Sequence, residues 1–498
     1  MKKKLVALFM SLFLLGACGS EKGNENKPIN SNKVVVRITQ DPDFLDPHKA
    51  VAAATGEILF NVFEGLIKID ANGDLYPALA ESYKVSNDHL TYTFKIRKGV
   101  QFQNGIELTP ELVKKSYDRF LDDNFPANRV ATEFKKISKS IEVKNDNVIF
   151  TLKKVNGSGL AAFIVGVVYD DGHKIYGTGP YFIDEYLPGE KVTVKKFNNY
   201  WNINQVGNAE IVDFKIIKDN QSAIMAFQMG EVNIIHRLFS GYEDMIGENG
   251  KLIKGEQNLV QLLAINNKVE PLNNLKVRQA IQYAIDKQEI IEGASLGEGS
   301  IVGSACSPVV KSIYNKNTEH LYSHNIEKAR ELLKEAGYPN GFELTLKAPS
   351  NYQVHVDSSQ IIKEQLAKIG IIVNIQEIEW GTWLSNVYKN RNYQLTVIGF
   401  EGKPSPYTIF SRYMSKDKRN MVNFSNEKYD EILNKISMEN NENEKVILFK
   451  EAQNILTKNV ASVFLQAPNY IVAINKNIDG FKIYPCYVLD LSLLNIRK

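Results

Sequence analysis

The chain has 498 residues, and 44% of them are apolar, which is enough to build large buried cores and two or three structural lobes. The chain has 60 Lys and Arg residues and 57 Asp and Glu residues, but three of the lysines, residues 2–4, lie in a predicted removable leader. The mature chain is therefore electrically balanced. A nucleic-acid-binding protein concentrates positive charge, so this composition argues against that class.

Residues 1–17 have the pattern of an export signal: a basic start, a short apolar run and small residues before Cys18. The run is too short to span a membrane. The phrase Leu15-Gly16-Ala17-Cys18 resembles a lipoprotein processing box and predicts that Cys18 carries a lipid. The alternatives are a plain secretory peptide with an incidental cysteine, or a membrane anchor. Residues 18–32 are polar and read as a tether with a reach of about 20 Å.

The folded body begins with a predicted strand over residues 34–39, followed by a turn-rich segment with spaced aspartates, residues 40–48. A calcium loop is disfavoured, because two prolines interrupt the segment and no later ligand set follows it. Turns formed by aspartate side chains explain the segment better.

The stretch from Glu57 to Phe120 is the most readable part of the chain. Two Asn-Gly pairs, at residues 72–73 and 104–105, predict turns on either side of an alternating strand over residues 90–96. A helix should follow, because Thr109 is a good N-cap and Pro110 suits the first helical position. A second strand pair is predicted over residues 141–152.

This region resembles the family 5 solute-binding proteins, the peptide and nickel receptors of ABC importers. The resemblance rests on the phrases PALAESYKVS, LTYTFKIRKGVQF and NGIELTPELV, and on GTGPY at residues 177–181. It implies an α/β, two-lobed, periplasmic-binding-protein-like fold with an extra small subdomain and a ligand cleft between the lobes. It also makes Val51 and Thr55, in a cleft-lining loop of that family, candidate ligand contacts.

The rest of the chain alternates between strands and helices, as expected for α/β lobes. A strand, helix and strand over residues 211–236 predict parallel strands. One long helix is predicted over residues 276–292, and Asn325 should cap another over residues 326–336. Strands are predicted over residues 342–348, 371–380, 393–400 and 470–475, helices over 356–369, 428–438 and 442–458, and a closing segment over 480–489.

The family pattern gives expected boundaries for the lobes. Lobe I should comprise residues 33–60, 177–260 and 470–498. The small subdomain should comprise residues 61–176, and lobe II residues 261–469.

The loop after the strand ending near Phe400 is the main candidate site, because ligands of open α/β sheets lie beyond the carboxyl ends of strands. Peptide receptors of the family place an aspartate before a proline here, and it holds the ammonium group of the peptide. In this chain the matching residue is Ser405, which carries no charge. Glu401 could take the place of that aspartate. Lys403 and Arg412 instead favour a solute with a carboxylate, or they are solvated surface charges. The candidate contacts in this region are Phe400, Glu401, Lys403, Ser405, Tyr407 and Arg412.

Two tryptophans and two histidines remain to be placed. Trp380 is a candidate ligand contact by its position in the EW phrase of the family, whereas Trp383 is better explained by packing. His320 and His324 are spaced like zinc ligands, but exposed loop histidines are the better interpretation. No catalytic motif appears, so no enzymatic activity, metal or cofactor is expected.

These observations predict an extracytoplasmic, lipid-anchored, monomeric receptor that delivers a solute to an ABC permease and its ATPase. Short peptides are the first substrate class, and a nickel complex with small chelators is the alternative. An extracellular hydrolase and an adhesive protein are the contrasting classes. Cys306 and Cys486 could pair or remain free thiols, since sequence alone does not place them together.

Overall fold

The structure is a computed structural model that describes residues 32–238, 240–439, 441–486 and 488–497. The predicted leader, the lipid attachment at Cys18 and all but the last residue of the tether lie outside the described residues.

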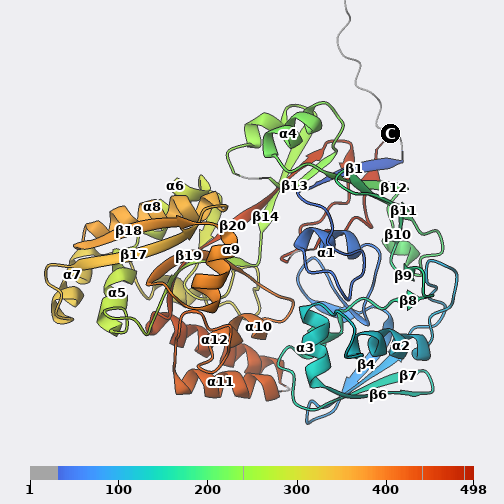
Figure 1. Ribbon diagram of the computed structural model, residues 1–498, viewed down its shortest axis with the longest axis horizontal. Coiled ribbons are helices and arrows are strands. Elements are labelled where there is room, and N and C mark those ends of the chain that lie inside the picture. Colours follow the sequence, from blue (N-terminus) through green and yellow to red (C-terminus); the bar gives the residue numbers. More distant parts are fainter. Residues whose placement is uncertain (1–31, 239, 440, 487, 498) are drawn as a thin grey trace, which may run out of the picture.

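One mixed sheet runs through both halves of the molecule (Figure 1). Its strands follow the order β10 (Tyr181–Leu187), β11 (Lys191–Lys196), β12 (Ile211–Ile216), β1 (Lys33–Ile38), β13 (Ile234–Leu238), β20 (Ser462–Asn475), β15 (Leu259–Ile265), β19 (Leu395–Glu401), β17 (Phe342–Pro349) and β18 (Ile371–Ile378), while β14 (Gly250–Glu256) and β16 (Gly299–Ile301) also pair with β20. The strand β1 is parallel to β12 and β13, and β17 is parallel to β18 and β19. This confirms the predicted α/β class and its parallel units.

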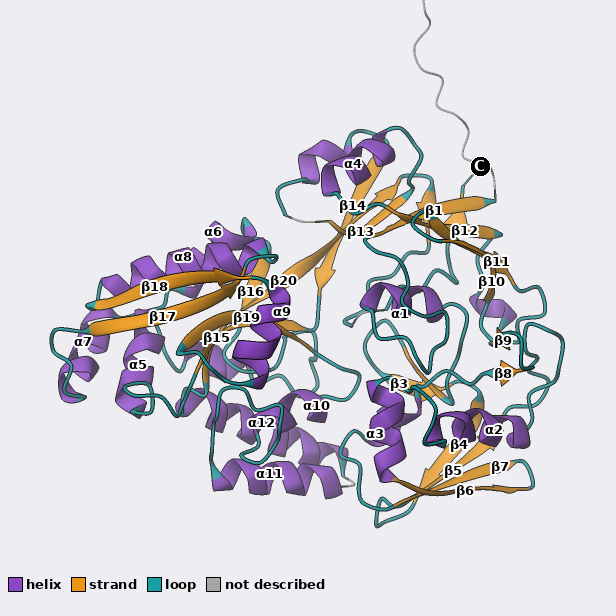
Figure 2. Ribbon diagram, viewed as in Figure 1, coloured by secondary structure: helices purple, strands orange, loops and turns teal. Residues whose placement is uncertain are grey.

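The long strand β20 belongs to both halves. Its first part pairs with β15 and β16, and its last part pairs with β13 and β14. The link between β14 and β15 is the first crossing in chain order, and β20 is the second. We call the half that contains β1 the first lobe and the half that contains β17 the second lobe. Figure 2 shows β14 and β20 running between them.

The second lobe has helices on both faces of its strands. Along β15, Leu263 and Ile265 pack into one core, whereas Leu262 and Ala264 pack into the other, as the two-residue period of a strand requires. One face is covered by α5 (Leu275–Ala284), α6 (Lys287–Ser295), α7 (Ile326–Glu335) and α8 (Gln353–Ala367). The other is covered by α10 (Tyr407–Phe410), α11 (Glu427–Met438) and α12 (Glu442–Lys458).

A separate four-stranded antiparallel sheet forms the core of the small subdomain. Its order is β4 (Ala80–Val85), β5 (Thr91–Ile96), β7 (Asn147–Leu152) and β6 (Ser138–Lys144), and α2 (Pro110–Leu121) and α3 (Arg129–Ile137) pack on it. The predicted cap is confirmed, because the Thr109 side chain accepts a hydrogen bond from the Leu112 amide. Gly73 and Gly105 adopt the positive φ that the two predicted Asn-Gly turns need.

The remaining elements are short. The helix α1 (Ala53–Leu59) follows the first strand, and α4 (Asn220–Gln228) connects β12 to β13. Short strand pairs are formed by β2 (Ile67–Ile69) with β3 (Leu75–Pro77), β8 (Tyr169–Asp170) with β9 (Ile175–Tyr176), and β21 (Ile478–Asp479) with β22 (Asn495–Ile496).

The structure corrects the sequence prediction at two points where a carboxylate starts a new helix. The helix expected over residues 276–292 is two helices, because the Asp286 side chain accepts hydrogen bonds from the amides of Gln288 and Glu289 and begins α6. The strand expected to reach residue 380 ends at Ile378. There the Glu379 carboxylate caps the short helix α9 (Trp380–Thr382), which continues as a π-helical segment.

The end of the chain also differs from the expectation. The strand predicted over residues 470–475 begins eight residues earlier, at Ser462, and Pro468 lies where β20 changes partners. Residues 480–486 and 488–489 form no strand. In that segment the Pro485 carbonyl instead accepts a hydrogen bond from the Asn258 amide, which ties the returning chain to the first crossing.

Candidate functional site

The candidate site is a cavity of about 1030 Å³ between the two lobes. It is lined by the small subdomain, the first crossing, the second lobe and the chain that returns from β20. The main segments are residues 69–75, 156–160, 255–258, 309–313, 403–407 and 483–486, together with side chains of α11 and α12. A solute in this cavity would touch both lobes at once.

The lobes meet directly at the rim of this cavity. The Ser158 and Thr408 hydroxyl oxygens lie 3.3 Å apart. Beside them Gly157 faces the ring of Tyr407, and a Cβ at position 157 would lie only 2.3 Å from the nearest ring carbon. The contact joins the small subdomain to the second lobe, and it requires a residue without a side chain at position 157.

The predicted loop after β19 forms part of the cavity wall. Lys403, Ser405 and Tyr407 all line the cavity. The Lys403 ammonium forms an ion pair with the Glu401 carboxylate, with an N–O distance of 2.8 Å. Ser405 is largely buried, and its carbonyl accepts a hydrogen bond from the Thr408 amide. The loop therefore offers a neutral hydroxyl and a partly neutralised cation.

The loop is fixed to the first crossing at Gly402. The Gly402 amide donates a hydrogen bond to the Asn258 carbonyl. A Cβ at position 402 would lie 1.9 Å from the side-chain Cγ of Asn258, so only glycine fits. Because Asn258 lies between β14 and β15, movement at this crossing is coupled to the position of the loop.

Three other predicted contacts lie beside the cavity and not on its described wall. The guanidinium of Arg412 lies over the ring of Phe400, 4.8 Å from its centroid. Glu401 ends β19 and reaches Lys403. Phe400 packs against the core that α11 and α12 cover. These residues pack next to the loop on the side away from the described cavity wall.

The two tryptophans stack on each other, with ring centroids 5.0 Å apart and an interplanar angle of 6°. Trp383 is buried, and its Nε1 donates a hydrogen bond to the Thr396 hydroxyl. Trp380 is half-buried and also meets the ring of Tyr352, which is exposed. Trp383 is thus a core residue, and Trp380 presents an aromatic edge at the end of β18, outside the described cavity wall.

Val51 and Thr55 are held by one aspartate. The Asp43 carboxylate accepts hydrogen bonds from the Val51 amide at 2.7 Å and from the Thr55 hydroxyl at 2.6 Å. Burial opposes ionisation of Asp43, but these hydrogen bonds outweigh it and lower the pKa of the carboxyl. The Thr55 side chain is fully buried, whereas Val51 is 74% exposed. Neither residue lines the cavity described above, and of the two only Val51 is exposed.

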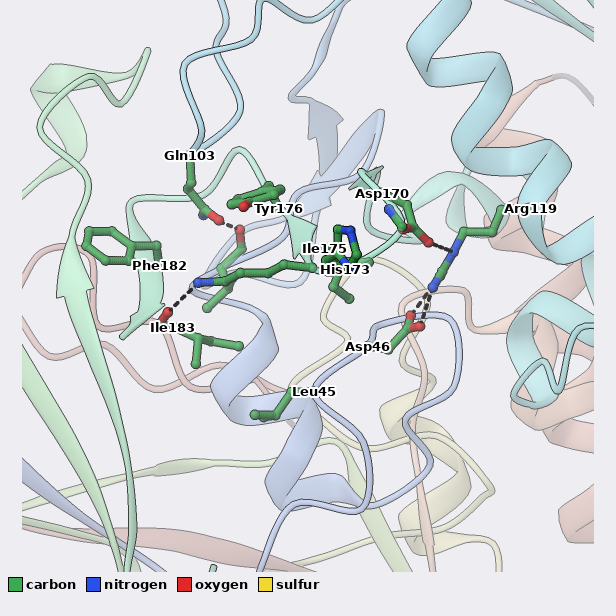
Figure 3. Close-up of a pocket in the computed structure, with 13 residues that line it drawn as sticks. Leu45, Asp46, Gln103, Arg119, Asp170, His173, Ile175, Tyr176, Phe182 and Ile183 are labelled. Carbon is green, nitrogen blue, oxygen red and sulfur yellow. Dashed lines mark hydrogen bonds and ion pairs between the residues drawn. The ribbon is translucent and has the colours of Figure 1, made fainter. Parts of the chain in front are cut away.

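A second cavity, of about 630 Å³, lies between α2, the β8–β9 hairpin and β10 (Figure 3). Its main charged groups pair with each other: the Arg119 guanidinium contacts Asp46 at 2.7 Å and Asp170 at 2.9 Å. The side-chain amide nitrogen of Gln103 donates to the backbone carbonyls of Val62 at 2.9 Å and Tyr181 at 2.7 Å. The first lobe and the small subdomain alone line this cavity, so lobe movement would not close it.

The cysteines and histidines form no metal site in the described part of the chain. Cys306 and Cys486 are free thiols, and burial raises the pKa of Cys486, which lines the larger cavity, to about 12. His320 and His324 are exposed to solvent. Among the described residues, no group of three or more His, Cys, Asp or Glu side chains could hold a metal ion. None of the described helices is both long and apolar enough to cross a membrane.

Several cavity-lining segments were not predicted from sequence, above all residues 156–160, 309–313 and 483–486. The first of these, Asn-Gly-Ser-Gly-Leu, carries a usable signal, since loops held by a rigid scaffold often carry binding residues. The other two reach the cavity only through long-range packing.

Known proteins share both the sequence pattern and the fold. The family model described as "Bacterial extracellular solute-binding proteins, family 5 Middle" matches residues 74–421. The glutathione-binding protein GsiB of Shigella flexneri serotype 5b (strain 8401) is 27% identical, over 97% of this chain and 96% of that protein.

Two solved structures show the same fold. The ABC transporter substrate-binding protein CtaP (Lmo0135) of Listeria monocytogenes superposes with a TM-score of 0.84 at 23% identity, over 94% of this chain and 99% of that chain. The oligopeptide-binding protein AppA of Bacillus subtilis, solved with a nonapeptide, gives a TM-score of 0.75 at 24% identity, over 94% and 99% of the two chains. These matches confirm the predicted two-lobed architecture. Since the family model also spans more than half of the chain, the protein belongs to family 5 of the bacterial extracellular solute-binding proteins.

Proposed function

We propose that this protein captures short peptides between its two lobes and delivers them to an ABC permease and its ATPase. The observation that carries the proposal is the cavity of about 1030 Å³ lined by both lobes. Small-molecule sites commonly occupy about 300–1,000 Å³, so a short peptide is a suitable occupant. The similarity to GsiB and AppA, which are named for binding glutathione and oligopeptides, supports the same substrate class.

The capture mechanism follows from the two crossings. The lobes are joined by β20 and by the link between β14 and β15, so they can rotate about these strands and close over a solute. We assign residues 33–60, 177–260 and 470–498 to one moving body, residues 61–176 to its small subdomain and residues 261–469 to the other. Backbone groups and pocket water would hold the peptide main chain, while Lys403, Ser405 and Tyr407 contact it from the second lobe.

The location of the receptor is part of the proposal. Residues 1–17 would direct export, Cys18 would carry the lipid, and residues 18–32 would tether a monomeric body above the membrane. This arrangement keeps the receptor near its permease on the extracytoplasmic side. The proposal includes no catalytic step.

Calorimetry on the soluble body from residue 19 onward tests the function. We expect triglycine or glutathione to bind with one site per chain, and nickel-histidine to produce no comparable heat. Binding of nickel-histidine without binding of either peptide would support the alternative nickel-complex receptor and contradict the peptide proposal. Hydrolysis of the peptides during the titration would also contradict it.

A further inference from the structure

Six Lys, Asp and Glu side chains line the larger cavity, and three of them, Lys403, Glu442 and Lys445, have ionic partners among the described residues, whereas Lys311 is a cation without one. The Lys403 ammonium pairs with Glu401 at 2.8 Å, and the Lys445 ammonium pairs with Glu442 at 2.7 Å. Two carboxylates, Asp74 and Glu256, line the cavity without an ion pair to any described residue. An unpaired carboxylate in a cavity that closes is costly unless the solute supplies a cation.

Of these two carboxylates, Glu256 lies beside a crossing between the lobes. It is the last residue of β14 and lies directly before the first crossing. The next residue, Gln257, accepts a hydrogen bond from the Ser307 hydroxyl of the second lobe at 2.9 Å. The residue after Gln257 is Asn258, which is held against Gly402. The backbone on the C-terminal side of Glu256 is therefore fixed by the second lobe, although β14 belongs to the first.

Glu256 is exposed and lines the cavity. Its negative charge also acts on Tyr314, a residue of the second lobe. Burial, the hydrogen bond to Glu319 and the nearby carboxylates, Glu256 included, raise the pKa of the Tyr314 hydroxyl. Asp74 differs, because it lies in a turn of the small subdomain where the Asp70 carboxylate accepts a hydrogen bond from its amide. Asp74 thus belongs to a local turn of the small subdomain, whereas Glu256 is at the junction of the lobes.

We propose that Glu256 receives the α-ammonium group of the bound solute. The inference rests on the proposed peptide function. It adds the residue that binds the amino terminus and therefore the direction in which the peptide lies. Ser405, which lines the same cavity from the second lobe, offers only a neutral hydroxyl, and Glu401 is engaged by Lys403. Glu256 is then the carboxylate best placed to form charge-assisted hydrogen bonds to an amino terminus as the lobes close. The solute class is accordingly a short peptide with a free amino group.

The test compares triglycine with N-acetyl-triglycine on the wild type and on Glu256→Gln. We expect the substitution to weaken triglycine binding at least about tenfold, since it removes a charge-assisted contact. Binding of the acetylated peptide should be unchanged by the substitution. Wild-type affinity for triglycine should also fall as the pH rises through the α-amino pKa of about 8, and Glu256→Gln should lose most of this dependence.

Two further variants make the result specific. Glu248→Gln removes an exposed carboxylate of the first lobe that is remote from the described cavity wall, and it should bind like the wild type. Asp74→Asn tests the other unpaired carboxylate. If Asp74→Asn and not Glu256→Gln loses affinity, or if Glu256→Gln binds triglycine as the wild type does, the inference is wrong while the peptide function stands. Failure of the wild type to bind either peptide would instead remove the function on which the inference rests.

Discussion

Replacing Gly157 by leucine is expected to weaken peptide binding about 30-fold, or about 2 kcal/mol, without lowering the melting temperature. A Cβ at this position would lie 2.3 to 2.6 Å from three ring carbons of Tyr407, so the small subdomain could not reach its present contact with the second lobe. The separated lobes would be unaffected, because the clash exists only when the lobes meet. Calorimetry and thermal unfolding, run on the same samples, measure the two effects.

The control for this variant is Gly56→Leu. Gly56 is exposed on α1, and a Cβ there meets no atom within 4 Å, so binding should remain at the wild-type level. Gly157 does not adopt the left-handed conformation, and a side chain at position 157 therefore adds no backbone strain. Wild-type affinity in Gly157→Leu would show that this interlobe contact is not part of the bound state.

The second large effect is expected on stability, at Glu64. This buried carboxylate lies between the first lobe and the small subdomain and accepts hydrogen bonds from the Tyr200 hydroxyl at 2.8 Å, the Trp201 Nε1 at 2.9 Å and the Thr178 hydroxyl at 3.1 Å. The Lys68 ammonium lies 3.4 Å away. Burial disfavours the charged form of Lys68, but the charges of Glu64 and Asp490 outweigh it and raise its pKa.

Glu64→Gln should therefore lower the free energy of unfolding by about 3 kcal/mol or more, because the change leaves a buried cation without its nearest counter-charge. The midpoint of urea unfolding, followed by tryptophan fluorescence, measures the loss. Glu81→Gln is the matched control, since Glu81 forms an exposed ion pair with Lys95 and should change stability by less than about 1 kcal/mol. Equal effects of the two substitutions would refute the role given to Glu64.

The local elements were largely predictable because their signals are local. The caps at Thr109 and Asn325 were read directly from residue type and spacing, and both side chains accept the expected backbone hydrogen bonds. The break at Asp286 was missed because the apolar periodicity of the two helices continues across it. The Asp286 carboxylate accepts hydrogen bonds from two amides and so starts a new helix at that position.

The site was predictable only in part, for a related reason. Lys403, Ser405 and Tyr407 follow the end of a strand, and a general rule for α/β sheets identifies such loops. The opposing wall comes from residues 156–160, which reach the cavity through packing of the small subdomain on the first lobe. The place of Glu256 also depends on long-range contacts, since residues 257 and 258 are held by Ser307 and Gly402. Short-range patterns do not encode these distances.

Closure over a peptide is the central claim, and a disulfide across the rim tests it most directly. The Ser158 and Thr408 hydroxyl oxygens are 3.3 Å apart, which is compatible with a disulfide between cysteines at these positions when the lobes are together. Cys306 is buried, and the raised pKa of Cys486, about 12, keeps its thiol protonated, so background reaction is low. The Ser158→Cys/Thr408→Cys variant should form its disulfide faster as triglycine is added, up to a plateau at saturation. A rate that does not change at any peptide concentration would contradict capture between the lobes.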